Sequence, residues 1–394
     1  MTHFTNERTI LILLALTSFI LFLSANLVKP VLPVMAKELR GNELEISSVL
    51  MISIVLLSLT QPVTGTLADK YGYIKLIVLG SLVGALSSLA CAYATSWKDL
   101  FILRALGGLA DAISAPAILA LVASISSRRR GLVFGVFRCS QGLSFVLGPI
   151  IGATIAKLIS LRAPFIFDFI LTVVAVATFI TFLNIKNGKD VVNGKSEGTF
   201  LNFQVLKGII TNKEMLKAAY LGFSENFSFT IWISFLPVYV LTLGFREVEI
   251  GLIISSEALA FSLSNIFVGY ASDRLGRKPV ALLGAVVTTT SSLSYLLVSN
   301  IEHLIVSSIL YGVGCSMIFL MSTVTATDII PESQRGLMLG TFDALMDLGL
   351  AIGSIFNWLI LKLTNLPLST SFLIMAFATG LIIPVCLKIK ERAR

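Results

Sequence analysis

Nine ionisable residues fall inside long apolar stretches of this sequence, where they could carry protons or bind a charged substrate. The acids are Asp111, Asp168, Glu225, Glu257, Asp343 and Asp347, and the bases are Lys29, Arg104 and Arg138. A charge inside a bilayer costs about 3 kcal/mol or more, so such residues usually mark an ion or substrate pathway. Because the acids outnumber the bases and burial favours a neutral carboxyl group, we expect some of the acids to bind and release protons. The only histidines, His3 and His303, lie outside these stretches, so carboxyl groups are the expected carriers.

Four of the nine residues are predicted to meet near the centre of the membrane. At roughly 1.5 Å per residue of helix, Asp111 and Arg138 both lie near the middle of their stretches and could pair. Asp343 occupies the position of Arg138 in a sequence repeat, and Asp347 follows one helical turn later. We therefore predict a proton-coupling cluster of Asp111, Arg138, Asp343 and Asp347. Lys29 and Asp168 lie near the ends of their stretches and are expected to be mainly structural.

A second group of residues is predicted to bind the substrate. Glu225 and Asn226 lie in the middle of an apolar stretch, with Trp232 and several phenylalanines nearby. Aromatic residues at this spacing usually serve packing, but a carboxylate among aromatic rings also suits a lipophilic cation. The predicted substrate contacts are Asn26, Glu225, Asn226, Trp232 and Glu257. Glu225 is also predicted to take part in proton coupling.

The composition indicates the structure that must position these residues. The 394-residue chain is 56% hydrophobic and only 13% charged, and its mean hydropathy is +0.91. We find twelve apolar stretches, six in each half, most of them about 20 residues long and therefore able to span a bilayer as helices. The alternating pattern of a membrane barrel is absent. The sequence predicts an all-α membrane protein with twelve transmembrane helices in two pseudo-symmetric six-helix bundles.

The distribution of Lys and Arg predicts the orientation and the domains. Most of these residues lie in connections that face the inside if the N-terminus is placed there, so both termini are expected in the cytoplasm of a multi-pass cell-membrane protein. The net charge of +8 suits an anionic inner leaflet and requires no nucleic acid. A polar, Lys-rich segment predicts a linker at 186–213 between bundles at 1–185 and 214–394.

Much of the first half recurs in the second half. The segment Gly65–Gly72 recurs as Gly269–Gly276 at an offset of 204 residues, which is the difference between Asp69 and Asp273. Both copies lie in predicted inner turns, where glycines allow a tight reversal and an aspartate can cap a helix. A single copy would indicate only a good turn, whereas an internal repeat is typical of transporters.

These two turns resemble the signature G-x-L-A-D-R-x-G-R-K of the major facilitator superfamily. The second copy retains the basic end as Arg277-Lys278, whereas the first has Tyr73-Ile74. The resemblance implies that the Asp and basic residues hold an inner gate closed while the outer side is open. The expected gate residues are Gly65, Asp69, Lys70, Gly72, Gly269, Asp273, Arg274, Gly276 and Arg277.

Further stretches resemble the twelve-span drug/proton antiporters of that superfamily. Pro30-Val31-Leu32-Pro33 is similar to the end of their first-span motif, and Arg104 matches an arginine that the family associates with proton coupling. The fifth stretch resembles G-x8-G-x3-G-P-x2-G-G through Gly135, Gly148, Pro149 and Gly152, with Ser144 and Ala153 in place of glycines. Small residues allow close helix approach, and proline adds a kink.

The resemblance implies proton-driven export of a small lipophilic or cationic compound by alternating access, by a chain that acts as a monomer among membrane lipids. A proton-coupled importer of a sugar or organic acid and a receptor that binds without transport remain alternatives. Neither a cofactor nor a metal is expected, because the four cysteines show no CxxC spacing. Gly194-Lys195-Ser196 resembles the end of a phosphate loop but lacks its first glycine, so we do not expect an enzyme.

Overall fold

Helices make up the regular structure in the part of the chain that the computed structural model describes, namely residues 2–126, 129–185, 211–245, 247–298, 300–331, 334–364 and 366–388. The first half contains α1 (Thr2–Val28), α2 (Leu32–Glu38), α3 (Glu43–Tyr71), α4 (Tyr73–Cys91), α5 (Trp97–Ile125), α6 (Arg130–Leu158) and α7 (Ala163–Ile185). The second half contains α10 (Lys213–Thr242), α11 (Glu247–Leu275), α12 (Arg277–Ser294), the 3₁₀ turn η1 (Tyr295–Leu297), α13 (Ile301–Ile329), α14 (Arg335–Thr364), α15 (Thr370–Gly380) and α16 (Ile382–Leu387). Most of the predicted linker lies outside the described residues.

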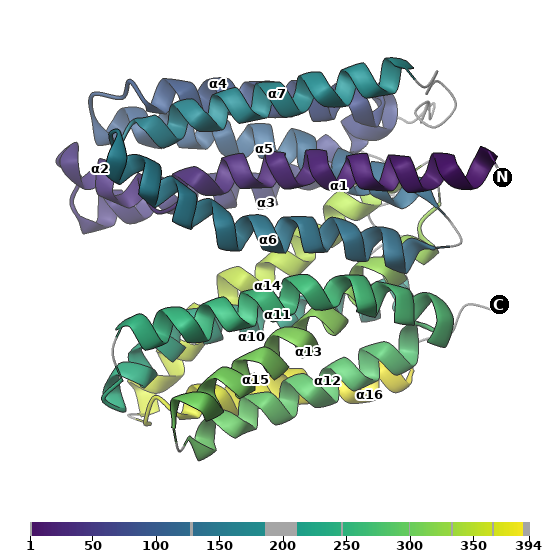
Figure 1. The fold of residues 1–394 in the computed structure, drawn as a ribbon. Coiled ribbons are helices and arrows are strands. Elements are labelled where there is room, and N and C mark those ends of the chain that lie inside the picture. The colour runs from purple at the N-terminus through teal and green to yellow at the C-terminus, as the bar shows by residue number, and fades with distance from the viewer. Residues whose placement is uncertain are drawn as a thin grey trace. The chain divides into compact units, whose positions relative to one another are not determined.

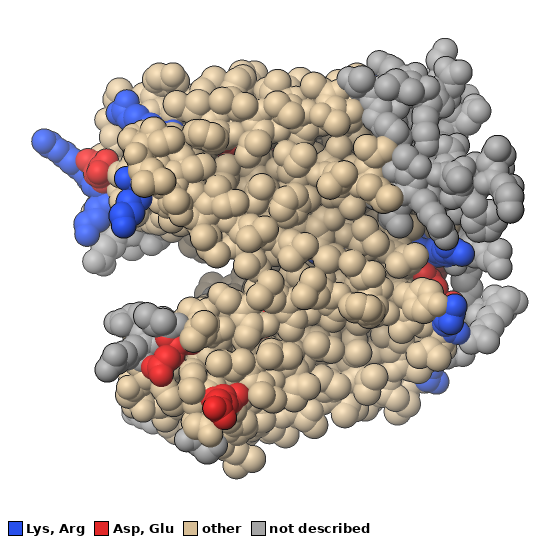
Figure 2. Space-filling model, in the orientation of Figure 1, with Lys and Arg blue, Asp and Glu red and all other residues tan. Residues whose placement is uncertain are grey.

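Eleven spans in the described residues are long and apolar enough to cross a membrane. The twelfth predicted span corresponds to α10, a 30-residue helix that contains Glu225 and Asn226. The last predicted span is divided at Leu381 into α15 and α16. Figure 2 shows the charged side chains on the displayed face gathered toward the helix ends, with a broad uncharged belt between them. This distribution agrees with the predicted all-α membrane fold.

Specific caps and glycines begin and end the helices. At the start of α3, the Asn42 side chain accepts from the Glu45 N–H while the Glu45 carboxylate accepts from the Asn42 N–H. Ser96 and Asp99 form the same capping box at the start of α5. Gly72 separates α3 from α4 with φ 92°, and Gly276 separates α11 from α12 with φ 102°. Glycine adopts these left-handed backbone conformations without the strain that a Cβ would cause.

The helices form two compact units, each with its own core. Unit 1 contains the described parts of Met1–Ser127, Leu143–Phe203 and Ile330–Thr341, and unit 2 contains those of Arg128–Gly142, Gln204–Ile329 and Phe342–Arg394. The first turns of α6 therefore pack with unit 2, and the first turns of α14 pack with unit 1. The helix order can be followed in Figure 1.

The two units use the same helix pairings. In unit 1, α5 packs on α3 and α4, and α7 packs on α1 and α4; in unit 2, α13 packs on α11 and α12, and α15 packs on α10 and α12. Individual contacts follow the 204-residue offset. The Ser87 hydroxyl donates to the Leu103 carbonyl at 2.5 Å, and the Ser291 hydroxyl donates to the Ser307 carbonyl at 2.5 Å. The sequence repeat is thus a structural repeat.

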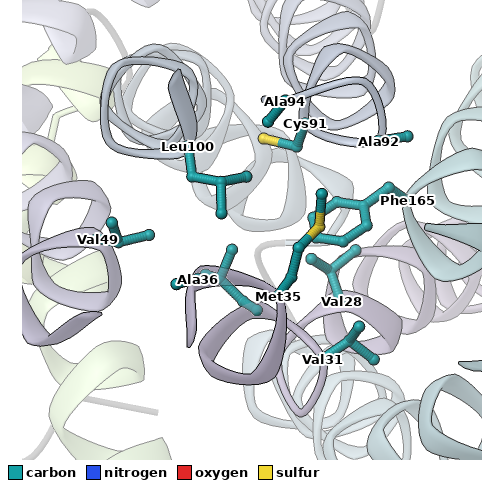
Figure 3. Close-up of a cluster of buried hydrophobic side chains, with 11 residues drawn as sticks. Val28, Val31, Met35, Ala36, Val49, Cys91, Ala92, Ala94, Leu100 and Phe165 are labelled. Atoms are coloured by element: carbon teal, nitrogen blue, oxygen red, sulfur yellow. The ribbon is translucent and has the colours of Figure 1, made fainter. Parts of the chain in front are cut away.

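Apolar side chains from several helices fill each unit. Figure 3 shows part of the unit 1 core, in which Met35 of α2, Leu100 of α5 and Phe165 of α7 lie in one buried cluster. In unit 2, the corresponding cluster includes the fully buried side chains of Trp232 and Tyr295. These cores hold the helices that carry the candidate site residues.

Candidate functional site

The first signature turn brings a carboxylate to the beginning of a distant helix within unit 1. Asp69, near the end of α3, accepts hydrogen bonds from the backbone N–H of Gly336 at 2.7 Å and of Leu337 at 2.9 Å. These are N–H groups of the first turn of α14, which have no partner inside their own helix. A negative charge there also interacts favourably with the helix dipole. Asp69 therefore caps α14.

Glycines make this approach possible. A Cβ on Gly65 would collide with the backbone of Gly336, and a Cβ on Gly336 would collide with the carbonyl of Gly65 and approach the Asp69 carboxylate to 2.9 Å. The two backbones meet with no side chain between them. This contact explains in physical terms why the signature requires a glycine four residues before the aspartate.

The second signature turn repeats the arrangement within unit 2. Asp273 accepts from the backbone N–H of Gly131 at 2.9 Å and of Leu132 at 2.8 Å, in the first turn of α6. A Cβ on Gly269 would collide with the carbonyl of Gly131. Each aspartate of the repeat therefore caps a helix that belongs to the other half of the sequence.

The second turn adds a network of charged side chains, and in the first turn Asp69 lies within electrostatic range of Arg335. Arg277 contacts Asp273 at 2.8 Å and Asp328 at 3.2 Å, and Arg130 contacts Asp328 at 2.8 Å. In the first turn, the position of Arg277 holds Tyr73, whose hydroxyl donates to Asp69 at 3.3 Å. The two caps share backbone geometry but differ in their side-chain chemistry.

The sequence did not identify Asp328 as a gate residue. It lies at the end of α13, outside both signature turns, and its repeat position holds Ser124. Of the other predicted gate residues, the Lys70 ammonium lies 5.4 Å from the Tyr71 ring centre and the Arg274 guanidinium lies 4.3 Å from that of Tyr270. The one feature of the sequence that could have indicated Asp328 is the position of this acid near the inner end of a predicted span.

The small residues of α6 lie at close helix contacts in both units. In unit 1, a Cβ on Gly148 would come within 2.5 Å of the Asn26 side chain, and one on Gly152 would collide with the carbonyl of Leu27. In unit 2, a Cβ on Gly135 would collide with the carbonyl of Asn265. Pro149 lies inside α6. The antiporter-like motif therefore corresponds to close packing of this helix.

Asn26, a predicted substrate contact, is buried against this helix. Its side-chain amide donates to the Phe22 carbonyl at 2.7 Å and to the Ser144 hydroxyl at 3.3 Å. Ser144 replaces a glycine of the antiporter pattern and is itself fully buried. The Ser144 hydroxyl lies where the pattern has a glycine and accepts the hydrogen bond from Asn26, so Asn26 links α1 to α6. Its contact with a substrate stays a prediction.

Unit 1 contains four of the nine ionisable residues. Asp111 lies within electrostatic range of Arg104, Lys29 and Asp168. Asp168 is 8% exposed and accepts a hydrogen bond from Thr172, whose hydroxyl also bonds to that of Ser24. These four residues are two acids and two bases.

Unit 2 contains the other five ionisable residues, which are Arg138, Glu225, Glu257, Asp343 and Asp347. Arg138 lies within electrostatic range of Asp343, Asp347 and Glu225. Its guanidinium donates to Gln141 at 2.8 Å and lies 4.4 Å from the ring centre of Phe319. Three members of the predicted cluster therefore lie together in unit 2, and the pairing of Arg138 with Asp111 of unit 1 stays a prediction.

Two further carboxyl groups lie deep in unit 2. Glu225 of α10 is 3% exposed and Glu257 of α11 is 4% exposed, and they lie within electrostatic range of one another. Asn226 donates to the Met346 carbonyl at 3.0 Å, and Trp232 donates to the Tyr295 hydroxyl at 2.9 Å. Polar groups from α10 and α11 thus lie beside the aromatic core.

Metal ligands are not grouped in the part of the chain that the structure describes: no three His, Cys, Asp or Glu side chains there could hold an ion together. The free cysteines in the described spans, Cys91, Cys139, Cys315 and Cys386, are buried. The chemistry available at the site is proton binding and the recognition of charged or polar groups.

A family profile described as Major Facilitator Superfamily matches residues 14–248 and 242–394. The chain belongs to the major facilitator superfamily. This result confirms the resemblance seen in the signature turns, together with the twelve-helix fold. Members of this superfamily are transporters rather than enzymes, and the chain is a multi-pass membrane protein.

Several known proteins of the superfamily are similar to this chain. An uncharacterized MFS-type transporter of Methanocaldococcus jannaschii is 23% identical over 348 residues, which is 86% of this chain and 88% of that protein. The multidrug resistance protein 2 of Bacillus subtilis is 29% identical over 45% of this chain and 44% of its own length. The quinolone resistance protein NorA of Staphylococcus aureus is 33% identical over 42% of this chain and 43% of its own length.

A solved structure shares the fold across nearly the whole chain. The human organic anion transporter MFSD10 superposes with a TM-score of 0.77 over 96% of this chain and 99% of its own, at 16% sequence identity. At that identity the likeness concerns the fold alone. The charged residues described above therefore lie on the helices of a superfamily transporter fold.

Proposed function

We propose that this superfamily transporter exports small lipophilic or cationic compounds in exchange for protons, by alternating access. The observation that carries the proposal is the charge content of unit 2, where four acids within the spans accompany one base, Arg138. Carboxyl groups in excess of bases inside a membrane avoid the cost of charge by holding protons. A group that holds a proton in one conformation and releases it in another can drive transport.

The proposed proton-coupling residues are Asp111, Arg138, Asp343, Asp347, Arg104 and Glu225. In this mechanism a cationic substrate and a proton compete for the same negative charges, so binding of one favours release of the other. Arg138 lies within electrostatic range of three of the acids, and its bond to Gln141 holds the guanidinium in place. The proposed substrate contacts are Glu225, Glu257, Asn226, Trp232 and Asn26.

The two aspartate caps are proposed to serve as the inner gate. Each cap joins a signature turn to the first turn of a helix from the other half of the sequence, so opening of the inner side would break the hydrogen bonds of Asp69 and Asp273. Protons and substrate would then shift the balance between capped and uncapped states. We propose the cell membrane as the location, with both termini in the cytoplasm, and a monomer as the working unit.

Two relatives support the export direction. The multidrug resistance protein 2 and the quinolone resistance protein NorA carry names that describe drug resistance, and both are similar to part of this chain. The antiporter-like close packing of α6 supports the same reading. Import of a sugar or organic acid and binding without transport are the alternatives that an experiment must separate.

The test is substrate-driven proton movement in proteoliposomes that carry a pH-sensitive dye. Under an imposed pH gradient, we expect ethidium flux opposite to proton flux, and a loss of at least about tenfold in Asp343→Asn and Glu225→Gln. Glu302→Gln, at an exposed position in the first turn of α13, is the matched control and should behave as the wild type. Flux in the same direction as protons would indicate an importer. Binding without flux would indicate a receptor.

A further inference from the structure

The membrane-spanning helices of unit 1 carry three charges that lie close together without closing into ion pairs. Lys29, Arg104 and Asp111 are within electrostatic range of one another. Within the described part of the chain, none of the three side chains forms an ion pair. Charged groups inside a membrane usually pair with one another or face water. Asp168 also lies within electrostatic range of Arg104 and Asp111, but it is buried and accepts a hydrogen bond from Thr172. Lys29, Arg104 and Asp111 can therefore still interact with a charged ligand.

Two of the three side chains are exposed, and that of Arg104 is partly exposed. Lys29 and Asp111 are exposed, although Asp111 lies at the middle of the 29-residue helix α5. A carboxylate at mid-helix does not face hydrocarbon, so this side of unit 1 must border water or a ligand. The Lys29 ammonium lies 4.1 Å from the ring centre of Phe145, which is 51% exposed. The Nε of Arg104 is buried and has no hydrogen-bond partner among the described residues.

The structural repeat argues against a packing role for these charges. At the 204-residue offset, Lys29, Arg104 and Asp111 correspond to Ile233, Ser308 and Cys315, which are uncharged. Unit 2 forms the same helix pairings without them. In contrast, Asp168 bonds to Thr172 within its own helix and is buried, as a structural acid would be. The helix packing of unit 1 therefore does not require the charges of Lys29, Arg104 and Asp111.

We propose that Lys29, Arg104 and Asp111 recognise an amphoteric substrate, a compound with a carboxylate, a protonated amine and an aromatic body. Lys29 and Arg104 would bind the carboxylate, and Asp111 would bind the amine. Arg104 and Asp111 are seven residues apart on one helix, which is two turns or roughly 10 Å along one face. Phe145 supplies an exposed aromatic surface beside the Lys29 ammonium.

This inference rests on the proposed function, because it names the substrate class of the same transporter. Lys29, Arg104 and Asp111 of unit 1 select the substrate, while the excess acids of unit 2 carry most of the protons. Asp111 and Arg104 keep their proposed part in proton coupling, because the substrate amine and a proton would compete for Asp111. A purely cationic compound would satisfy Asp111 but would leave the two bases without a partner.

The test is a binding comparison between two dyes that differ by one charge. Rhodamine 110 carries a free carboxylate, and rhodamine 123 is its methyl ester. Binding to the purified protein in lipid nanodiscs is followed by fluorescence anisotropy, with empty nanodiscs as the blank. We expect the wild type to prefer the acid at least about tenfold. Lys29→Gln should remove most of this preference, and Lys29→Arg should restore it.

The matched control is Lys98→Gln, because Lys98 is an exposed lysine of the same unit that lies 5.9 Å from the ring centre of Trp97. It should retain the wild-type preference. A wild type that binds both dyes equally, or a preference that Lys29→Gln does not alter, would overturn the inference. The binding assay uses no pH gradient, so failure of proton coupling in proteoliposomes would refute the proposed function while leaving the preference for the acid intact.

Discussion

Asp69 and Gly336 lie 267 residues apart in the sequence, yet the backbone N–H of Gly336 donates a 2.7 Å hydrogen bond to the Asp69 carboxylate. The same relationship joins Asp273 to Gly131 at 2.9 Å. Both carboxylates interact with the unpaired N–H groups and the dipole of a helix N-terminus. One difference between the two caps is that Arg277 contacts Asp273 at 2.8 Å, whereas the equivalent Tyr73 is neutral and Asp69 lies within electrostatic range of Arg335.

This difference predicts unequal costs for the two Asp→Asn changes. Asp69→Asn removes a negative charge at a helix N-terminus, which is worth about 1–2 kcal/mol. Asp273→Asn removes the same interaction and also deprives Arg277 of one of its two acid partners, so we expect a larger loss of about 2–4 kcal/mol. Thermal unfolding of the detergent-solubilised protein measures both. Equal losses, or a larger loss for Asp69→Asn, would contradict the account.

Arg277 and Asp328 are predicted to be energetically coupled. Their ion pair at 3.2 Å is largely buried, and Arg130 also contacts Asp328 at 2.8 Å. In a double-mutant cycle of Arg277→Ala and Asp328→Ala, we expect an interaction energy of about 1–3 kcal/mol. The corresponding cycle of Tyr73→Phe with Asp69→Ala should give about 1 kcal/mol or less, because it involves one neutral hydrogen bond at 3.3 Å. Additive effects in the first cycle would show that the network contributes no coupling.

The signature glycines are predicted to tolerate no side chain at the helix crossings. Gly65→Ala and Gly269→Ala each place a methyl group against a facing backbone carbonyl, so we expect a loss of about 1–3 kcal/mol or failure to accumulate in the membrane. Gly251→Ala is the matched control, because nothing lies within 4 Å of a Cβ at that position in α11. It should be neutral or slightly stabilising. Expression level and melting temperature are the readouts.

The sequence was sufficient to predict the helices and the repeat, because both depend on local patterns. A bilayer requires about 20 apolar residues per span, and the 204-residue offset that relates Asp69 to Asp273 also relates the Ser87 and Ser291 hydrogen bonds. α10 was recognised from its apolar stretch even though Glu225 and Asn226 interrupt it. Patterns that repeat along the chain can be read without knowing the tertiary contacts.

Contacts between distant helices were much harder to predict. Asp328 belongs to no motif, and its counterpart in the first half is the uncharged Ser124, so its pairing with Arg130 and Arg277 depends on how α13 approaches α6 and α12. Asn26 is a predicted substrate contact, and its hydrogen bond to Ser144, which depends on the close approach of α6 to α1, could not be predicted from the sequence. For Asp328 and Asn26 alike, the residue type shows that the side chain can form polar contacts, whereas the packing of distant helices determines which residue it contacts.

The aromatic core of unit 2 provides a final prediction, which concerns two buried tyrosines. The Tyr295 hydroxyl accepts from Trp232 at 2.9 Å and bonds to Ser308 at 2.8 Å. The Tyr311 hydroxyl is fully buried beside the thiol of Cys315, a weak hydrogen-bonding group, and makes no stronger hydrogen bond among the described residues, while its ring lies 5.5 Å from that of Trp232. Removal of a well-bonded hydroxyl leaves its partners unsatisfied, whereas removal of one that has only a weak thiol partner mainly removes a desolvation cost.

We therefore expect opposite outcomes from the same chemical change. Tyr295→Phe should destabilise the protein by about 1–3 kcal/mol, because the Trp232 N–H is left buried without its acceptor. Tyr311→Phe should be neutral or stabilising. Melting temperatures of the two variants provide the comparison, and the fluorescence of Trp232 should change in Tyr295→Phe as its hydrogen bond is lost. A destabilised Tyr311→Phe would show that its hydroxyl has a partner in the membrane, and the nearby carboxyl group of Glu225 would be the first to examine, because it lies within electrostatic range.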